Sequence, residues 1–277
     1  MKYGIVISVS NTRFGPVVFK ENLNENIIKA GAIGYDGVEL AIRKPEEVDI
    51  TKVKRLIKKH NLQIISLGTG QIYGEECLSF SDPDKDIRNK AVEKTKRIID
   101  IAKHLNASII IGLIRGNINN SENFNEELRK AEKRISQCLE ELLSYSKKDA
   151  INFLLEPINR YETNIFNRLD ETNNFLLKFK EKLGSSRIGI LADTFHMNIE
   201  EPNICKSFEN IFPVIKHIHF ADSNRQPPGY GHIDFKKVMK VLKKNKYKGF
   251  ISFEMLPFPD SDTAAKKALE YIKKLDS

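Results

Sequence analysis

Short apolar runs alternate with amphipathic stretches along the whole chain of 277 residues, and this alternation restricts the fold more than any other feature. The apolar runs are brief and rich in β-branched residues, as expected of parallel strands that are buried on both faces. Helical spacing is clearest in 84–105 and 122–146 and recurs in 51–60, 169–183, 234–244 and 262–275. The eight expected strands are Tyr3–Val9, Tyr35–Leu40, Gln63–Leu67, Ser108–Ile114, Asn152–Ile158, Arg187–Asp193, Val214–Phe220 and Gly249–Met255.

Eight β-then-α units predict an α/β protein with a single (β/α)8 TIM barrel. No segment rich in Pro, Gly and Ser divides the sequence, so we expect one domain over residues 1–277. A doubly wound open sheet has similar strands, but it usually has a Gly-rich phosphate turn after its first strand. The segment 9–14, Val-Ser-Asn-Thr-Arg-Phe, contains no such turn, which favours the barrel.

The formal charge of +8 does not by itself indicate a nucleic-acid partner. The lysines are scattered along helical faces, whereas a nucleic-acid footprint needs a concentrated patch with aromatic residues beside it. No apolar run is long enough to span a bilayer, and the first residues lead directly into an expected strand in place of a cleavable leader. We therefore expect a soluble, cytoplasmic protein that binds neither nucleic acid nor membrane.

Four acidic or imidazole side chains stand at the ends of the last four expected strands: Glu156, Asp193, His219 and Glu254. The carboxyl ends of the strands of a parallel barrel meet at one mouth, so these side chains are expected to form a metal cage there. Oxygen and nitrogen donors without cysteine favour Mn²⁺, Co²⁺ or Mg²⁺ over a closed structural zinc site. His217 shares a strand face with His219 one layer deeper, where we expect a hydrogen-bonded supporting histidine.

The motifs around these residues resemble those of a known superfamily. Glu156-Pro-Ile-Asn-Arg-Tyr-Glu162, Asp193-Thr-Phe-His196 and His219-Phe-Ala-Asp-Ser-Asn-Arg225 are similar to motifs of the xylose-isomerase-like TIM barrels, and most similar to those of the ketose 3-epimerases, the D-tagatose/D-psicose 3-epimerase group. The resemblance covers essentially the whole chain. It implies one divalent metal ion per chain, Mn²⁺ first with Co²⁺ or Mg²⁺ as alternatives, held by the four residues of the cage. It also implies sugar contacts from Glu162, His196 and Arg225, and a homodimer or homotetramer.

The chemistry of epimerisation by itself explains why two of these carboxylates are needed. A proton beside a ketone is weakly acidic, so the developing cis-enediolate needs electrostatic stabilisation, which a chelating cation supplies. Inversion at C3 also requires acid/base groups on both faces of the carbon. Glu156 and Glu254 suit this role because their strands are separated by about 135° around the mouth of an eight-stranded ring.

The first four strands border the open part of the mouth, where we expect substrate selectivity to arise from Glu39, the loop Gly68–Tyr73 and Arg115. Glu39 is expected to bind a sugar hydroxyl or to pair with Arg43. Arg115 is expected to recognise a carboxylate or phosphate of an acidic sugar, or to form a structural ion pair. The segment Tyr73–Phe80 is long for a loop of this kind, and we leave open whether it is a lid or a surface excursion.

Other functions remain open on sequence alone. An aldose-ketose isomerase or a keto-inositol isomerase would use the same cage, because both reactions begin with proton abstraction beside a carbonyl. An endonuclease IV-like enzyme would need further histidines on the second and third strands, where this chain has Glu39 and Gly68-Thr69. A catalytically silent barrel that only binds a ligand would not need all four candidate metal ligands.

Overall fold

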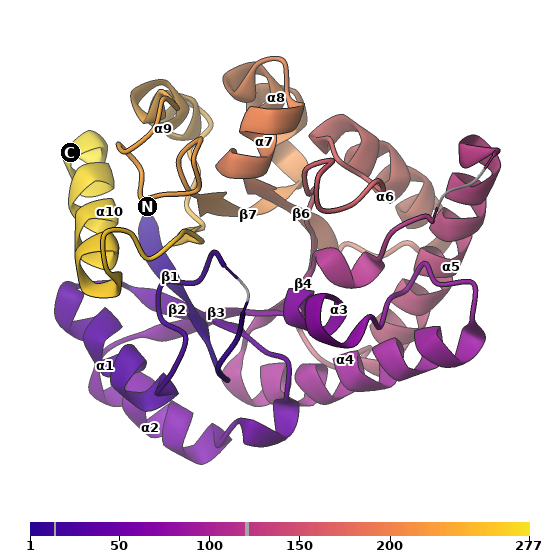
Figure 1. Cartoon of the computed structure of the whole chain (residues 1–277), viewed down its shortest axis with the longest axis horizontal. Coiled ribbons are helices and arrows are strands. Elements are labelled where there is room, and N and C mark those ends of the chain that lie inside the picture. Colours follow the sequence, from indigo (N-terminus) through magenta and orange to yellow (C-terminus); the bar gives the residue numbers. More distant parts are fainter. Residues whose placement is uncertain (14, 120–121) are drawn as a thin grey trace.

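The computed structural model describes residues 1–13, 15–119 and 122–277. Its strands form one closed parallel barrel in the order of the sequence, from β1 to β8, and β8 pairs with β1 (Figure 1). The predicted (β/α)8 TIM barrel is therefore confirmed. The strands are β1 Lys2–Ser8, β2 Gly37–Ala41, β3 Gln63–Gly68, β4 Ser108–Ile111, β5 Phe153–Leu155, β6 Ile188–Asp193, β7 Ile215–Phe220 and β8 Phe250–Phe253.

Helices surround the barrel on its outer side (Figure 1). The α-helices are α1 Leu23–Ile33, α2 Ile50–Lys59, α3 Gly70–Glu76, α4 Lys85–Leu105, α5 Phe124–Tyr145, α6 Leu169–Leu183, α7 Thr194–Glu200, α8 Ile204–Ile211, α9 Phe235–Lys244 and α10 Ser261–Asp276. Short 3₁₀ helices η1, η2 and η3 span Pro45–Glu47, Leu113–Arg115 and Phe212–Val214. Among the described residues, no helix is both long enough and apolar enough to cross a bilayer.

The strands are apolar because both of their faces are covered. All six residues of β6 are buried, and so are the last six of β1, since one face lines the barrel interior and the other packs against helices. Polar side chains begin many of the helices at the mouth: those of Asp49, Asp84, Asn123 and Asp193 accept hydrogen bonds from backbone N–H groups of the first helical turn. These caps fix the βα connections from which a TIM-barrel site is built.

Two of the expected strands end earlier than their apolar runs. Strand β4 ends at Ile111, whereas its run continues to Ile114, and β5 ends at Leu155. The chain leaves β4 at Gly112, where an added Cβ would lie 2.7 Å from Oε2 of Glu156. Glycine at this position therefore leaves room for the Glu156 carboxylate beside the end of β4.

Candidate metal and substrate site

The four side chains expected to form a cage come together at one end of the barrel. Glu156 directly follows β5, Asp193 ends β6, His219 lies in β7 and Glu254 directly follows β8. Each offers one possible ligand atom, and these four atoms all lie within 4.8 Å of one another. Three of the residues are buried and Glu254 is partly buried. This arrangement is compact enough for a single ion to contact all four side chains.

Unpaired polar atoms indicate that the cage suits a cation. Oε1 of Glu156, Oδ2 of Asp193 and Nδ1 of His219 are buried, and none has a hydrogen-bond partner among the described residues. Nδ1 of His219 lies 3.7 Å from Oε1 of Glu156 and 4.0 Å from Oδ2 of Asp193. Buried polar atoms normally have partners, so three unpaired atoms converging on one point fit a divalent metal ion.

Asp193 faces the cage because its other oxygen has a structural role. Oδ1 accepts a hydrogen bond of 2.7 Å from the backbone N–H of Phe195, and this bond caps α7. The N-terminal turn of a helix also favours a negative charge. The cap thus orients the carboxylate and leaves Oδ2 directed towards Glu156 and His219.

His219 is oriented by a buried carboxylate below it. Its Nε2 lies 3.1 Å from the carboxylate of Glu39, which leaves Nδ1 for the cage. Glu39 is 2% exposed and also accepts hydrogen bonds from the hydroxyl of Ser66 and from Nε2 of His217. His217 therefore has the supporting position expected of it.

Two expectations for Glu39 need correction. It does not pair with Arg43, whose guanidinium instead pairs with Glu75. Glu39 borders the cavity beside the cage, but its carboxylate is engaged by buried donors, so the structure supports orientation of His219 and not a contact with the sugar.

The prediction that Arg115 recognises a substrate anion is wrong in this geometry. Arg115 has no exposed surface, and its guanidinium donates to four backbone carbonyls, those of Gly112, Glu156, Ile165 and Phe166. The physical reason is the early end of β4: the chain turns through η2 and carries this side chain into the protein behind Glu156. Arg115 therefore connects the backbone of Glu156 to that of Ile165 and Phe166 through hydrogen bonds.

The three residues expected to contact sugar lie beside the cage. Arg225 donates to Glu162 at 2.8 Å and to Oε2 of Glu254 at 3.1 Å, and its guanidinium lies over the ring of Phe195. Nε2 of His196 lies 3.8 Å from Oδ2 of Asp193. The structure thus brings Glu162, His196 and Arg225 to the same cavity as the cage.

Burial strongly perturbs the acid–base behaviour of the cage. Burial, and then the neighbouring charge of Glu254, raises the pKa of Glu156 well above its ordinary value and that of Asp193 to about 7. Burial also raises the pKa of Glu254. For His219 burial acts to lower the pKa, but the carboxylates of Glu39, Glu254 and Glu156 together outweigh it and raise the pKa to about 10. A bound cation would replace protons that otherwise neutralise this cluster.

The cavity beside the cage has a volume of about 40 Å³. One water molecule needs roughly 10–15 Å³, so the cavity has room for an ion with a few waters. A sugar would enter only if side chains at the mouth moved. Its wall opposite the cage is formed by small or apolar residues and by Gln71 of α3. Gln71 belongs to the loop Gly68–Tyr73 from which selectivity was expected, although the sequence did not single out this side chain.

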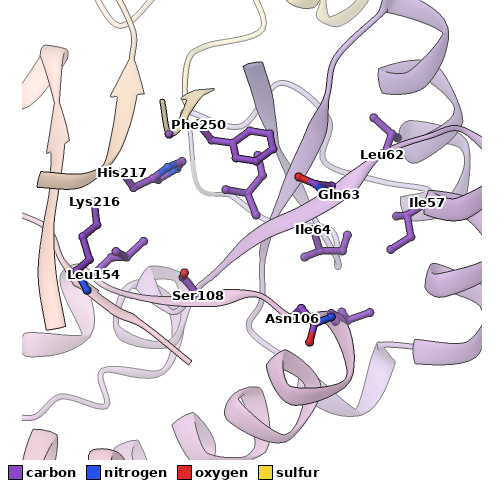
Figure 2. A pocket seen from close by; sticks show the side chains of 13 residues that line it. Ile57, Leu62, Gln63, Ile64, Asn106, Ser108, Leu154, Lys216, His217 and Phe250 are labelled. Atoms are coloured by element: carbon purple, nitrogen blue, oxygen red, sulfur yellow. The ribbon is translucent and has the colours of Figure 1, made fainter. Parts of the chain in front are cut away.

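A larger cavity, of about 440 Å³, lies at the opposite end of the barrel, where the strands begin (Figure 2). Gln63, Ser108, Lys216 and Phe250 contribute to its wall. Active sites of TIM barrels lie at the carboxyl ends of the strands, so volume alone does not identify the site here. The smaller cavity is lined by three of the four candidate metal ligands, Glu156, His219 and Glu254, and is the stronger candidate.

Comparison with known proteins gives full-length relatives. An L-ribulose 3-epimerase from Methylomonas sp. (strain DH-1) is 29% identical over 267 residues, which are 90% of this chain and 90% of the relative. A ketose 3-epimerase from Arthrobacter globiformis is 28% identical over 236 residues, covering 84% of this chain and 78% of the relative. The crystal structure of a D-allulose 3-epimerase from Methylomonas sp. has a TM-score of 0.80 at 27% identity, covering 99% of this chain and 96% of that one.

These relatives confirm the predicted enzyme class, an isomerase acting on carbohydrates. The family profile described as "Xylose isomerase-like TIM barrel" matches residues 27–275, a range that includes the whole cage. The chain belongs to the xylose isomerase-like TIM barrel family.

Proposed function

We propose that this protein is a metal-dependent ketose 3-epimerase that inverts C3 of its substrate through a cis-enediolate. The observation that carries the proposal is the cage itself, in which two glutamates, an aspartate and a histidine present ligand atoms within 4.8 Å of one another. The similarity to an L-ribulose 3-epimerase and a ketose 3-epimerase along most of the chain supports it. When bound, a divalent cation such as Mn²⁺ stabilises negative charge on the substrate oxygens.

Glu156 and Glu254 are the proposed acid and base. They come from β5 and β8, on different sides of the mouth, so each can approach a different face of one carbon. Burial raises the pKa of both carboxyl groups in the metal-free protein, so each is a stronger base there than an exposed glutamate. One glutamate removes the C3 proton and the other returns a proton to the opposite face.

Arg225, Glu162 and His196 are the proposed sugar-binding residues. Arg225 is held between Glu162 and Glu254, so it presents a fixed donor at the edge of the cage. It is the sole lysine or arginine among the described residues that line the cavity, and two carboxylates already neutralise it. With Arg115 buried behind Glu156, this lining favours an uncharged ketose over a keto-uronate or a sugar phosphate.

The test is hydrogen exchange in deuterated water. Protein loaded with Mn²⁺ is incubated with L-ribulose, D-allulose and D-tagatose, and the labelled carbon is located by NMR. Label at C3 together with the C3 epimer supports the proposal, whereas label at C1 would favour an aldose-ketose isomerase. Glu156→Gln should abolish exchange, and the measurement is informative if this variant still binds Mn²⁺.

The same experiment separates inversion at C3 from inversion at C4. A 3-dehydro-D-guloside 4-epimerase from Escherichia coli (strain K12) is 30% identical, but over only 122 residues, or 44% of this chain. The L-ribulose 3-epimerase and the ketose 3-epimerase align in sequence over 90% and 84% of the chain, which favours C3. Inversion at C4 without label at C3 would reject the proposal.

A further inference from the structure

Gln71 lies on the wall of the cavity opposite the metal cage, and its side chain has an incomplete set of hydrogen bonds. It is the second residue of α3, which follows β3, whereas the cage is built from β5 to β8. The residue is only 2% exposed. Its Oε1 atom is buried and has no hydrogen-bond partner among the described residues. Such an unpaired buried acceptor is costly and calls for a partner.

A chain of hydrogen bonds determines which way the amide faces. The hydroxyl of Ser8 donates its one hydrogen to the carbonyl of Ser10 at 2.6 Å. Its oxygen can then only accept, so the amide must present its NH₂ group to Ser8, and Nε2 of Gln71 lies 3.0 Å from that oxygen. The other end of the amide, Oε1, is therefore the group left for a ligand in the cavity.

We infer that Gln71 is a specificity-determining residue that accepts a hydrogen bond from a substrate hydroxyl remote from the reacting carbons. An amide oxygen accepts hydrogen bonds and cannot donate them, so its complement is an O–H group. A carboxylate or phosphate oxygen at this position would face another acceptor and would be repelled. The inference rests on the proposed function and adds to it a requirement for a free hydroxyl at one defined position of the sugar.

The experiment compares wild type with Gln71→Leu on one ketose and its monodeoxy analogues. The ketose is whichever of L-ribulose and D-allulose turns over faster, and kcat/KM is measured for it and for each analogue lacking one hydroxyl away from C2 and C3. Loss of a neutral hydrogen bond should lower kcat/KM of wild type about 3- to 10-fold for one analogue. The Gln71→Leu variant should no longer discriminate between the ketose and that analogue. Its discrimination against the other analogues should be unchanged.

Controls separate this inference from the proposed function. Gln63→Leu changes an exposed glutamine at the start of β3, far from the cage, and should leave all preferences unchanged. If Gln71→Leu does not fold, Gln71→Met keeps the length of the side chain and takes its place. If wild type and Gln71→Leu discriminate equally against every analogue, the inference is overturned. If wild type does not exchange the C3 hydrogen of any ketose, the proposed function is overturned instead.

Discussion

Nε2 of His219 lies 3.1 Å from the Glu39 carboxylate, on the side of the imidazole ring that faces away from the cage. The bond places the proton of the neutral ring on Nε2 and directs the lone pair of Nδ1 towards Glu156 and Asp193. His217 and Ser66 also donate to Glu39 and hold its carboxylate in place. Two strands that are three positions apart in the barrel, β2 and β7, thereby both determine the orientation of one metal ligand.

Glu39→Gln should therefore weaken Mn²⁺ binding by about 10- to 100-fold, the usual cost of losing a partner that orients a metal ligand. The amide retains the shape of the carboxylate but not its charge. Isothermal titration calorimetry gives the dissociation constant directly. Glu75→Gln is the matched control, since Glu75 pairs with Arg43 away from the cage and should not change the affinity. An unchanged Mn²⁺ affinity in Glu39→Gln would refute the orienting role.

The stabilising effect of metal should increase with pH. Asp193 has a pKa of about 7 in place of 3.8, and His219 has one of about 10 in place of 6.5. Both values are raised on folding, so the metal-free protein loses stability as pH rises, between 3.8 and 7 for Asp193 and between 6.5 and 10 for His219. A bound cation replaces these protons, so the metal-bound protein does not lose this stability as pH rises.

We accordingly expect Mn²⁺ to raise Tm more at pH 8 than at pH 6, and its binding to release protons. Thermal unfolding with and without Mn²⁺ tests the first expectation. Calorimetry in two buffers of different ionisation enthalpy tests the second. Proton uptake, or a rise in Tm that is larger at pH 6, would contradict the assigned protonation states.

The sequence was sufficient to predict the barrel and the cage because both depend on local patterns. Each cage residue ends or follows an apolar run, and parallel strands bring such ends together. Arg115 was misjudged because its run continues past Ile111, so the sequence did not show that the strand ends there and the chain turns inward at Gly112. The loop Gly68–Tyr73 was expected to contribute to selectivity, but the seven residues of α3 are too few for a helical period to be read, so the sequence did not show that Gln71 faces the cavity.

Arg115→Leu should destabilise the protein by roughly 2–5 kcal/mol, because four backbone carbonyls lose a buried donor. Urea unfolding measures the free energy of unfolding of the variant and of wild type. Arg168→Leu is the comparison: Arg168 pairs with Asp170 at the surface, and its loss should cost less than about 1 kcal/mol. If the free energy of unfolding fell equally in the two variants, the buried hydrogen bonds of Arg115 would contribute little to stability.

Gly112→Ala should reduce epimerase activity and also lower stability. The added Cβ would lie 2.7 Å from Oε2 of Glu156, so the carboxylate must move away from the end of β4. A misplacement of a catalytic group by about 1 Å can cost about 100-fold in rate, so a smaller shift of the proposed acid/base Glu156 should also be felt. We expect kcat to fall by at least 10-fold while KM changes little, because the substitution moves a proposed proton-transfer group and not the proposed sugar-binding residues. The backbone of Gly112, at φ −98° and ψ −118°, lies outside the regions that alanine favours, so some stability is lost as well.

The matched variant is Gly74→Ala in α3, where an added Cβ meets no atom within 4 Å. It should retain wild-type kcat and gain slightly in stability, since alanine is favoured over glycine in a helix by about 1 kcal/mol. Steady-state kinetics on the best ketose, together with urea unfolding of both variants, separates a local effect on Glu156 from a general loss of fold. Wild-type kcat in Gly112→Ala would mean that the position of the Glu156 carboxylate is not critical for proton transfer.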